Sequence, residues 1–432
     1  MYSKISVFLI ILIFSLAACQ HATKETNNTH ALTNNQTKKP FIEEEKIASQ
    51  TNTTNWLQPP YKYWSLKNVD KLFPVGIIAT SKKSLALEKE LIDLSDLKIE
   101  QFDGKTYGFE EHLDSNRTDG FLVLHKGKII YEKYFGNRTE TSTHNWFSVS
   151  KSLTGLTTAI LAAEGKIDLQ KPVLQYLPAL KGTAWDGPTV QQVMDMEVNI
   201  KFEEVYMDPR SDAYKFSRVT RFVVSPKIKP EFDNVLDYFK SVKKGENQEE
   251  KFHYVSLNTE VLGMIIHTVT GKQPSEVMSE KVWSKMGTEQ DAFVVRDPNG
   301  HEMVSAAINS TLRDAGRLGL LVLNDGYMNG QQIFPKSVAK TIKKGGSIEK
   351  FKDSKRGKVF KNYHYTNQWW HTDKAAFFAK GLFGQWIYVD PASETVIVKF
   401  TTSDIPTSTE YDWMNNSNLM EAIVEYLGNE MK

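Results

Sequence analysis

Several residue types and motifs are rare or absent in this sequence of 432 residues, and each absence excludes a class of function. It has one cysteine, Cys19. Lys and Arg total 53 against 52 Asp and Glu, and we find no basic stripe with interleaved aromatics, so nothing indicates a nucleic-acid partner. The motifs G-x-S-x-G, H-E-x-x-H, G-x-G-x-x-G and the P-loop are absent, and ten histidines lie scattered without metal-ligand spacing. We therefore expect no nucleic-acid partner, no metal and no cofactor.

The first residues form a short apolar segment behind a positive start. Residues 7–18, VFLIILIFSLAA, are too few to cross a membrane comfortably, and Leu16-Ala17-Ala18 leads directly into Cys19. This pattern resembles a bacterial lipoprotein signal, in which the cysteine is lipidated and becomes the new N-terminus. The resemblance implies a signal peptide over residues 1–19 and a lipid anchor in the bacterial cell envelope, on the periplasmic side of the outer membrane. The alternative is an ordinary secretory signal.

Residues 20–55 are rich in Asn, Thr, Lys and Gln and poor in apolar groups. Such a segment cannot bury enough surface to fold, so we expect a flexible polar tether between the anchor and a folded part over residues 56–432. The mature chain would carry no further thiol, which excludes disulfides within it and a cysteine nucleophile.

The folded part shows β patterns near its start and end and helical patterns between them. Residues 119–135 are typical of a hairpin, a helical pattern begins at Ser150, and residues 171–178 favour a short extended link. Residues 375–402 indicate two further strands, and residues 419–427 an amphipathic helix. We expect an α+β fold in which helices flank an antiparallel sheet (about 115–175 and 340–432), with a mostly helical region over about 176–339. Residues 56–117 receive no assignment.

Ser148 and Lys151 form an S-x-x-K motif at the start of an apolar helix. The spacing alone is weak, because it occurs at four other places in the chain. Here the helix brings the ammonium and the hydroxyl to one face, and the helix N-terminus favours negative charge on the serine oxygen. A serine is a weak nucleophile until a neighbour takes its proton, and a buried lysine with a lowered pKa can do so. The alternative is a serine N-cap beside a solvated lysine.

The phrase FSVSKSLTGLTTAILAAEGKIDLQKPVLQYLP, which carries this motif, resembles the nucleophile helix of the class C β-lactamase-like serine hydrolases, a family that includes penicillin-binding proteins. Tyr254-Val255-Ser256, followed by Leu262-Gly263, resembles the family's second motif in the form found in the 6-aminohexanoate-dimer hydrolase branch. The resemblance implies a β-lactamase/transpeptidase-like fold. It also implies that Tyr254 shares proton transfer with Lys151, and that Ser256 supports the site.

The family's third motif, Lys-Thr-Gly or His-Thr-Gly on an inner strand, is altered. Ala379-Lys380-Gly381 occupies the matching positions, so the first-position cation is missing. We expect Lys380 to point to the opposite sheet face. Gly381 permits a close backbone approach, and the resemblance implies that the Leu382 and Ser148 amides form an oxyanion hole. Tyr206, in a segment similar to a substrate-side loop of the same branch, is a pocket candidate with surface packing as its alternative.

Together these residues predict a serine hydrolase that cleaves a small amide or ester through an acyl-enzyme on Ser148. The loss of the cation at Ala379 predicts little demand for carboxylate recognition. Two alternatives stay open. One is a cell-wall D,D-peptidase or β-lactamase, which the envelope location favours and Ala379 disfavours. The other is a non-catalytic envelope lipoprotein that keeps the fold as a binding module.

Overall fold

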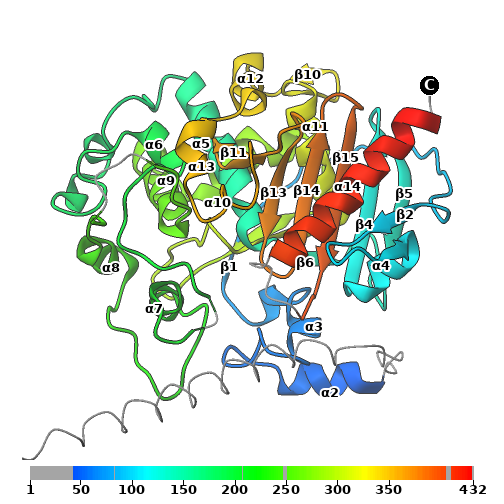
Figure 1. The fold of residues 1–432 in the computed structure, drawn as a ribbon. Helices are drawn as coiled ribbons and strands as arrows, with labels where there is room; N and C mark the ends of the chain where they lie inside the picture. The colour runs from blue at the N-terminus through cyan, green and yellow to red at the C-terminus, as the bar shows by residue number, and fades with distance from the viewer. Residues whose placement is uncertain (1–41, 82, 207, 247–250, 405–409, 431–432) are drawn as a thin grey trace, which may run out of the picture. The chain divides into compact units, whose positions relative to one another are not determined.

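The computed structural model describes residues 42–81, 83–206, 208–246, 251–404 and 410–430 (Figure 1). The predicted signal peptide and Cys19 therefore lie outside the described residues. The chain divides into two compact units, one up to Ser49 and one from Gln50 onward. Within the predicted tether, Ile42–Gln50 forms helix α2, so the tether prediction is wrong for this part. The sequence IEEEKIASQ explains the helix, because Glu, Lys and Ala are good helix formers.

A seven-stranded sheet, antiparallel throughout, forms the centre of the second unit, in the order β11-β12-β13-β14-β15-β4-β5 (Figure 1). Its strands are β4 (Thr118–His125), β5 (Lys128–Tyr134), β11 (His364–Thr366), β12 (Trp369–His371), β13 (Phe377–Gly381), β14 (Gln385–Asp390) and β15 (Thr395–Thr401). The hairpin predicted over residues 119–135 is confirmed. Residues 375–402 hold three strands rather than two, because positive φ angles at Phe383 and Gly384 make a tight turn between β13 and β14.

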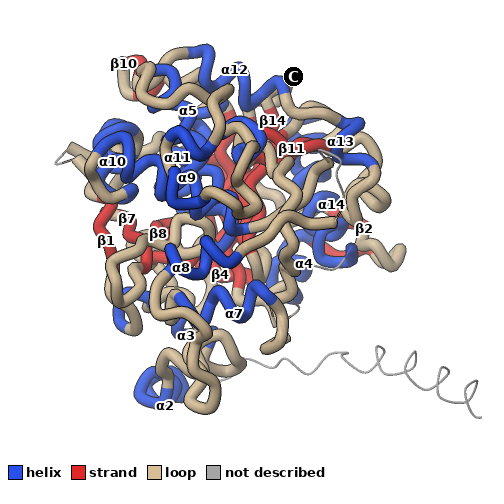
Figure 2. The backbone as a smooth tube through the Cα atoms, turned by 90° about the vertical axis from the view of Figure 1, so that its left-hand side faces the viewer, coloured by secondary structure: helices blue, strands red, loops and turns tan. Residues whose placement is uncertain are grey.

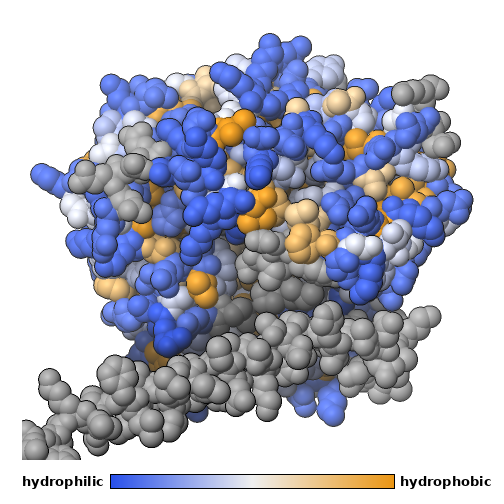
Figure 3. Space-filling model, viewed as in Figure 1, coloured by the Kyte–Doolittle hydropathy of each residue, from blue (hydrophilic) through white to orange (hydrophobic). Residues whose placement is uncertain are grey.

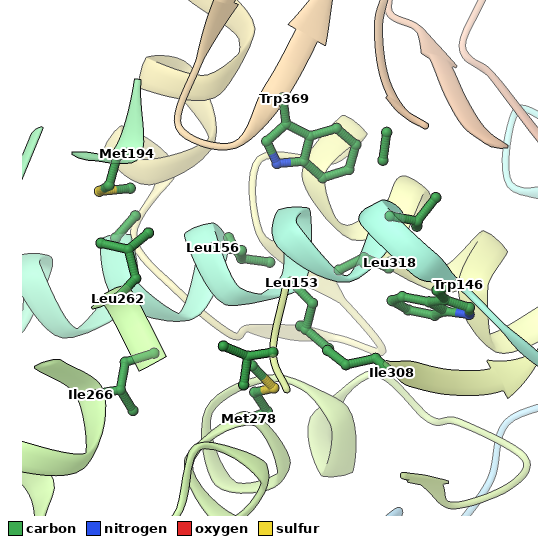
Figure 4. Close-up of a cluster of buried hydrophobic side chains, with 14 of the residues drawn as sticks. Trp146, Leu153, Leu156, Met194, Leu262, Ile266, Met278, Ile308, Leu318 and Trp369 are labelled. Carbon is green, nitrogen blue, oxygen red and sulfur yellow. The ribbon is translucent and has the colours of Figure 1, made fainter. Parts of the chain in front are cut away.

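Helices cover both faces of this sheet (Figure 2). Side chains alternate along β14: Ile387 and Val389 join the core beneath α5 (Ser150–Ala163) and α11 (Leu312–Leu323), whereas Trp386 and Tyr388 join the core beneath α14 (Glu410–Glu430). In the first core, Leu153 and Leu156 of α5 lie among aromatic, aliphatic and methionine side chains from several elements (Figure 4). The α+β prediction is confirmed, and the predicted C-terminal helix extends over twenty-one residues.

The region between the two halves of the sheet is mainly helical, as predicted. Its helices include α6 (Val190–Met194), α7 (Asp212–Val219), α8 (Val235–Ser241), α9 (Ser256–Thr270), α10 (Pro274–Lys281) and α12 (Lys336–Lys344). The predicted extended link over residues 171–178 is wrong. Two 3₁₀ turns form there, η3 (Val173–Gln175) and η4 (Pro178–Leu180), the second with proline in its first turn, where no amide hydrogen is needed.

A second, four-stranded sheet has the order β1-β7-β8-β6 and was not predicted. Its strands are β1 (Val75–Ile78), β6 (Thr143–Asn145), β7 (Ala292–Val295) and β8 (Ile308–Thr311). Each has four residues or fewer, too short for a periodic signal. Much of the unassigned stretch 56–117 is also short elements: α3 (Lys62–Ser65), η1 (Val69–Lys71), β2 (Lys98–Glu100), β3 (Thr106–Gly108) and α4 (Phe109–Ser115).

The face seen in Figure 3 is mostly polar, and apolar side chains lie scattered over it. Across the described residues, no helix combines the length and apolar character needed to cross a membrane.

Candidate active site

Ser148 lies in a one-turn 3₁₀ segment, η2 (Phe147–Val149), that leads into α5. The residue before it, Phe147, has a φ of 45°, which is unusual for a bulky side chain. Its amide donates to Asn145 Oδ1 at 2.9 Å, and the amide of Trp146 donates to the Ile308 carbonyl at 2.9 Å. These bonds hold a strained turn, and strain of this kind is common at functional sites.

Lys151 lies within hydrogen-bonding distance of the serine hydroxyl. Its Nζ lies 3.0 Å from Ser148 Oγ and donates to the carbonyl oxygen of Ser305 at 2.8 Å. Lys151 is only 1% exposed. Burial lowers the pKa of Lys151 to about 8, although Glu204 and Glu260 act in the opposite direction. About a tenth of the amine is therefore neutral at pH 7 and able to accept a proton, far more than for a lysine with its ordinary pKa.

Tyr254 lies two residues before α9 and completes the predicted trio. Its hydroxyl hydrogen-bonds to Ser148, and Lys151 Nζ lies 5.3 Å from its ring centroid. On β12, Trp370 stacks on the same ring at 5.2 Å. Burial raises the pKa of Tyr254 above its ordinary value, which outweighs the lowering by Ser148. The structure thus brings Ser148, Lys151 and Tyr254 together, with the phenol protonated at neutral pH.

Ser256 and Tyr206 both bind the carboxylate of Glu204, a residue that was not predicted from the sequence. Glu204 accepts hydrogen bonds from the Ser256 amide, from Ser256 Oγ at 3.2 Å and from the Tyr206 hydroxyl. The two hydroxyls lie 3.4 Å apart. Burial raises the pKa of Glu204, opposed by Lys151, Ser256 and Arg356. Glu204 lies two residues before Tyr206, in the segment from which Tyr206 was predicted as a pocket residue. That proximity in the sequence could have identified Glu204 as well.

Gly381 ends β13 directly against the nucleophile turn. A Cβ at this position would lie 2.2 Å from the Trp146 carbonyl oxygen and 3.2 Å from Phe147 Cβ, so only glycine fits. Leu382 follows, and its side chain packs in the cluster that contains Phe147. The β13 end therefore runs alongside the residues that precede Ser148, the arrangement that an oxyanion hole built from the Leu382 and Ser148 amides would need.

The altered third motif has the predicted geometry. Ala379 packs in the core beneath α5, while Lys380 points to the other face of the sheet. There Lys380 Nζ binds Asp412 Oδ2 at 3.0 Å and lies 5.0 Å from the ring centroid of Trp413, both on α14. Lys380 therefore does not replace the cation that is missing at Ala379, and that prediction is confirmed.

Two further polar groups near the trio were not identified from the sequence. Glu260 on α9 is fully buried; it accepts from the Ser305 amide at 3.0 Å and pairs with His301 Nε2 at 2.9 Å. The Arg356 guanidinium carbon lies 5.8 Å from the Tyr254 ring centroid. Neither residue belongs to a short motif, so no local pattern could have identified them. Among the described residues, no group of three or more His, Cys, Asp or Glu side chains is arranged to hold a metal ion.

Comparisons with known proteins show which proteins this chain resembles. The sequence model of the β-lactamase family matches residues 109–419. The 6-aminohexanoate-dimer hydrolase of Paenarthrobacter ureafaciens is 29% identical over 377 residues, which cover 87% of this chain and 94% of that protein. A solved structure from Bacillus anthracis, assigned as a 6-aminohexanoate-dimer hydrolase, superposes with a TM-score of 0.80 at 31% identity, covering 88% of this chain and 98% of that chain.

A class C β-lactamase shares the fold at a TM-score of 0.54 and 14% identity, over 73% of this chain and 93% of that chain. The predicted β-lactamase/transpeptidase-like fold is confirmed by these matches.

Proposed function

This chain belongs to the β-lactamase family and is a hydrolase of that family; on that premise we propose that it cleaves a small amide or ester through an acyl-enzyme on Ser148. The observation that carries the proposal is the 3.0 Å contact between Ser148 Oγ and the buried Lys151 Nζ, whose pKa is lowered to about 8. A nucleophile within hydrogen-bonding distance of a neutral amine is the arrangement that covalent catalysis needs.

Lys151 is the better candidate for the first base. A base must be unprotonated at the working pH, and the pKa of Lys151 is lowered to about 8, while that of Tyr254 is raised. Lys151 would take the proton as Ser148 attacks the carbonyl carbon. Tyr254, protonated and bonded to Ser148, would then give its proton to the leaving nitrogen or oxygen and take the serine proton from Lys151, which leaves the amine neutral again. Water attacks the acyl-enzyme in the second half of the reaction, Lys151 accepts the proton that this water releases, and that proton passes to the Ser148 oxygen as the acyl group leaves.

The negative charge on the tetrahedral intermediate needs donors fixed in advance. The close approach of Gly381 to the Trp146 carbonyl supports a role for the Leu382 and Ser148 amides. Oriented amides of this kind cost no reorganisation when charge develops, and removing one such donor typically costs about a hundredfold or more in kcat.

The names of the relatives favour an amide bond as the substrate, and the absence of a cation at Ala379 weighs against a β-lactam or cell-wall peptide recognised through that position. Reaction with a fluorophosphonate probe, mapped by mass spectrometry, tests the nucleophile. We expect labelling at Ser148, loss of labelling in Ser148→Ala, and hydrolysis of p-nitrophenyl esters or amino-acid amides that disappears in the same variant.

Ser337→Ala is the matched control, because Ser337 and Lys340 have the same spacing on the exposed side of α12. It should leave both activities intact. Labelling by a fluorescent penicillin with slow ester hydrolysis would instead support the D,D-peptidase or β-lactamase alternative. A folded protein that reacts with neither probe would support a binding module.

We further propose that the mature chain is anchored to the bacterial envelope by a lipid on Cys19, facing the periplasm from the outer membrane. The sequence pattern Leu16-Ala17-Ala18-Cys19 supports this proposal. A hydrolase tethered in this way would meet small amides or esters that enter the envelope.

A further inference from the structure

Arg356 lies outside the three family motifs, and its positively charged guanidinium lies beside the ring of Tyr254. It lies between α13 (Ile348–Lys352) and β11, where its carbonyl accepts from the amides of Val359 and Phe360 at 3.1 and 2.8 Å. Its guanidinium carbon lies 4.6 Å from the Trp413 ring centroid, 5.4 Å from that of Trp370 and 5.8 Å from that of Tyr254. Three aromatic rings therefore fix the guanidinium beside the group that touches Ser148.

This arginine is half-buried, yet it has no carboxylate partner within the part of the chain that the structure describes. Two other shielded arginines differ in this respect, because Arg138 binds Asp119 and Arg317 binds Asp314. Glu204 is the nearest candidate that influences Arg356, but its oxygens are engaged by Ser256 and Tyr206, and it makes no ion pair with the guanidinium. An arginine held on aromatic faces keeps its planar set of donors available for an incoming anion.

The segment around Arg356 is strongly basic. Lys352, Lys355, Lys358 and Lys361 are all exposed on it. Of the two acidic residues nearby, Glu349 pairs with Lys352 of this segment and Asp353 lies 3.4 Å from Lys251. Lys355, Lys358 and Lys361 therefore carry the basic character of the segment. A field of one sign next to a cleft raises the local concentration of oppositely charged ligands.

We propose that Arg356 binds a carboxylate on the substrate, so that the enzyme prefers amides or esters whose acyl chain ends in an acid. The inference rests on the proposed function, since it needs an acyl group on Ser148. Tyr254 spans the two points: its hydroxyl bonds to Ser148 and its ring lies beside Arg356. A short acyl chain with its carbonyl at Ser148 would place a terminal carboxylate near the guanidinium. The anion recognition lost at Ala379 is thus supplied from the side of Tyr254 on which Arg356 lies.

A pair of matched esters tests this. The monoester of glutaric acid with p-nitrophenol and p-nitrophenyl valerate share the leaving group and chain length, and differ in one terminal carboxylate. We expect the wild type to have the higher kcat/KM for the glutarate ester. In Arg356→Gln the ratio of the two kcat/KM values should fall about tenfold or more, mainly through KM of the anionic ester. Arg356→Lys, which keeps the charge but loses the planar donors, should fall between.

Lys358→Gln is the matched control, because it removes the same charge from an exposed position of the same segment. It should change the ratio less than twofold. A general effect of Arg356 on Tyr254 would change kcat/KM for both esters equally and would leave the ratio of the two values unchanged. If Arg356→Gln does not fold, Arg356→Lys provides the measurement instead. An unchanged ratio in the Arg356 variants, or an equal fall in Lys358→Gln, would overturn the inference.

The two proposals fail in different ways. If neither ester is hydrolysed in a Ser148-dependent manner, the proposed function is wrong. If both are hydrolysed by the wild type and neither by Ser148→Ala, but the ratio does not depend on Arg356, only the role of Arg356 is wrong.

Discussion

Ser305 links Lys151 to Glu260 through its backbone: its carbonyl accepts from Lys151 Nζ at 2.8 Å, and its amide donates to Glu260 at 3.0 Å. His301 binds the other side of this carboxylate at 2.9 Å. Burial lowers the pKa of His301, but the hydrogen bond and charge of Glu260, together with the charges of Asp297 and Glu302, outweigh burial and raise the pKa above its ordinary value. The buried Glu260 carboxylate is therefore linked to Lys151, the proposed base, through the backbone of Ser305, and it raises the pKa of Lys151.

The pH dependence of the wild type follows from Lys151. Because the neutral amine is the reactive form and its pKa is about 8, kcat/KM should be low in acid and rise with pH through about 8. Initial rates of ester hydrolysis between pH 5 and 10, corrected for spontaneous hydrolysis, measure this limb. Lys151→Met should lower kcat/KM by about a hundredfold or more. A rate that is flat between pH 6 and 9 in the wild type would contradict the role of Lys151.

Glu260→Gln should shift this limb to lower pH. The carboxylate of Glu260 raises the pKa of Lys151, so its removal lets the amine lose its proton more readily. The same pH series measures the shift, and Glu280→Gln on the exposed surface of α10 is the control that should not move it. A purely structural role of Glu260 would lower the rate at every pH without moving the limb.

Gly381→Ala should inactivate the enzyme, because the added Cβ would lie 2.2 Å from the Trp146 carbonyl oxygen. We expect β13 to move away from the nucleophile turn and kcat to fall about a hundredfold or more, as on loss of an oxyanion donor. Steady-state kinetics and thermal unfolding separate misplacement from unfolding. Gly428→Ala in α14, where an added Cβ meets no atom within 4 Å, should retain full activity and gain a few tenths to about 1 kcal/mol of stability.

Cys19→Ala tests the lipid anchor. The unchanged protein should fractionate with membranes and be extracted by detergent, while the variant should either lose this association or stay unprocessed at its N-terminus. Metabolic labelling with an alkynyl fatty acid distinguishes these results from simple adhesion. Lipid labelling that persists in the Cys19→Ala variant would show that the anchor lies elsewhere.

The sequence predicted what local spacing encodes. Ser148 and Lys151 stand one helical turn apart, so their proximity follows from the helix itself, and the alternation of side chains along a strand predicted that Lys380 would face away from Ala379. The hairpins and long helices could also be predicted from the sequence, because their periodic patterns extend over many residues.

The rest depends on contacts between distant segments, for which a single sequence holds no local signal. Glu260 acts on Lys151 only because α9 packs beside α5, and Arg356 meets Tyr254 only after β11 and β12 bring their aromatic side chains to the same place. The four-stranded sheet was missed for the same reason, since its strands are too short to carry a pattern.

The pairing of β15 with β4 joins a strand near the start of the folded part to one made almost last. Until ribosomes have completed β15, the part of the central sheet that contains β13 cannot join β4 and β5, because β15 is the strand between them. A chain still being synthesised would thus be catalytically silent. If export proceeds before folding, hydrolytic activity would first emerge outside the cytosol, and metabolites inside the cell would never encounter the competent enzyme.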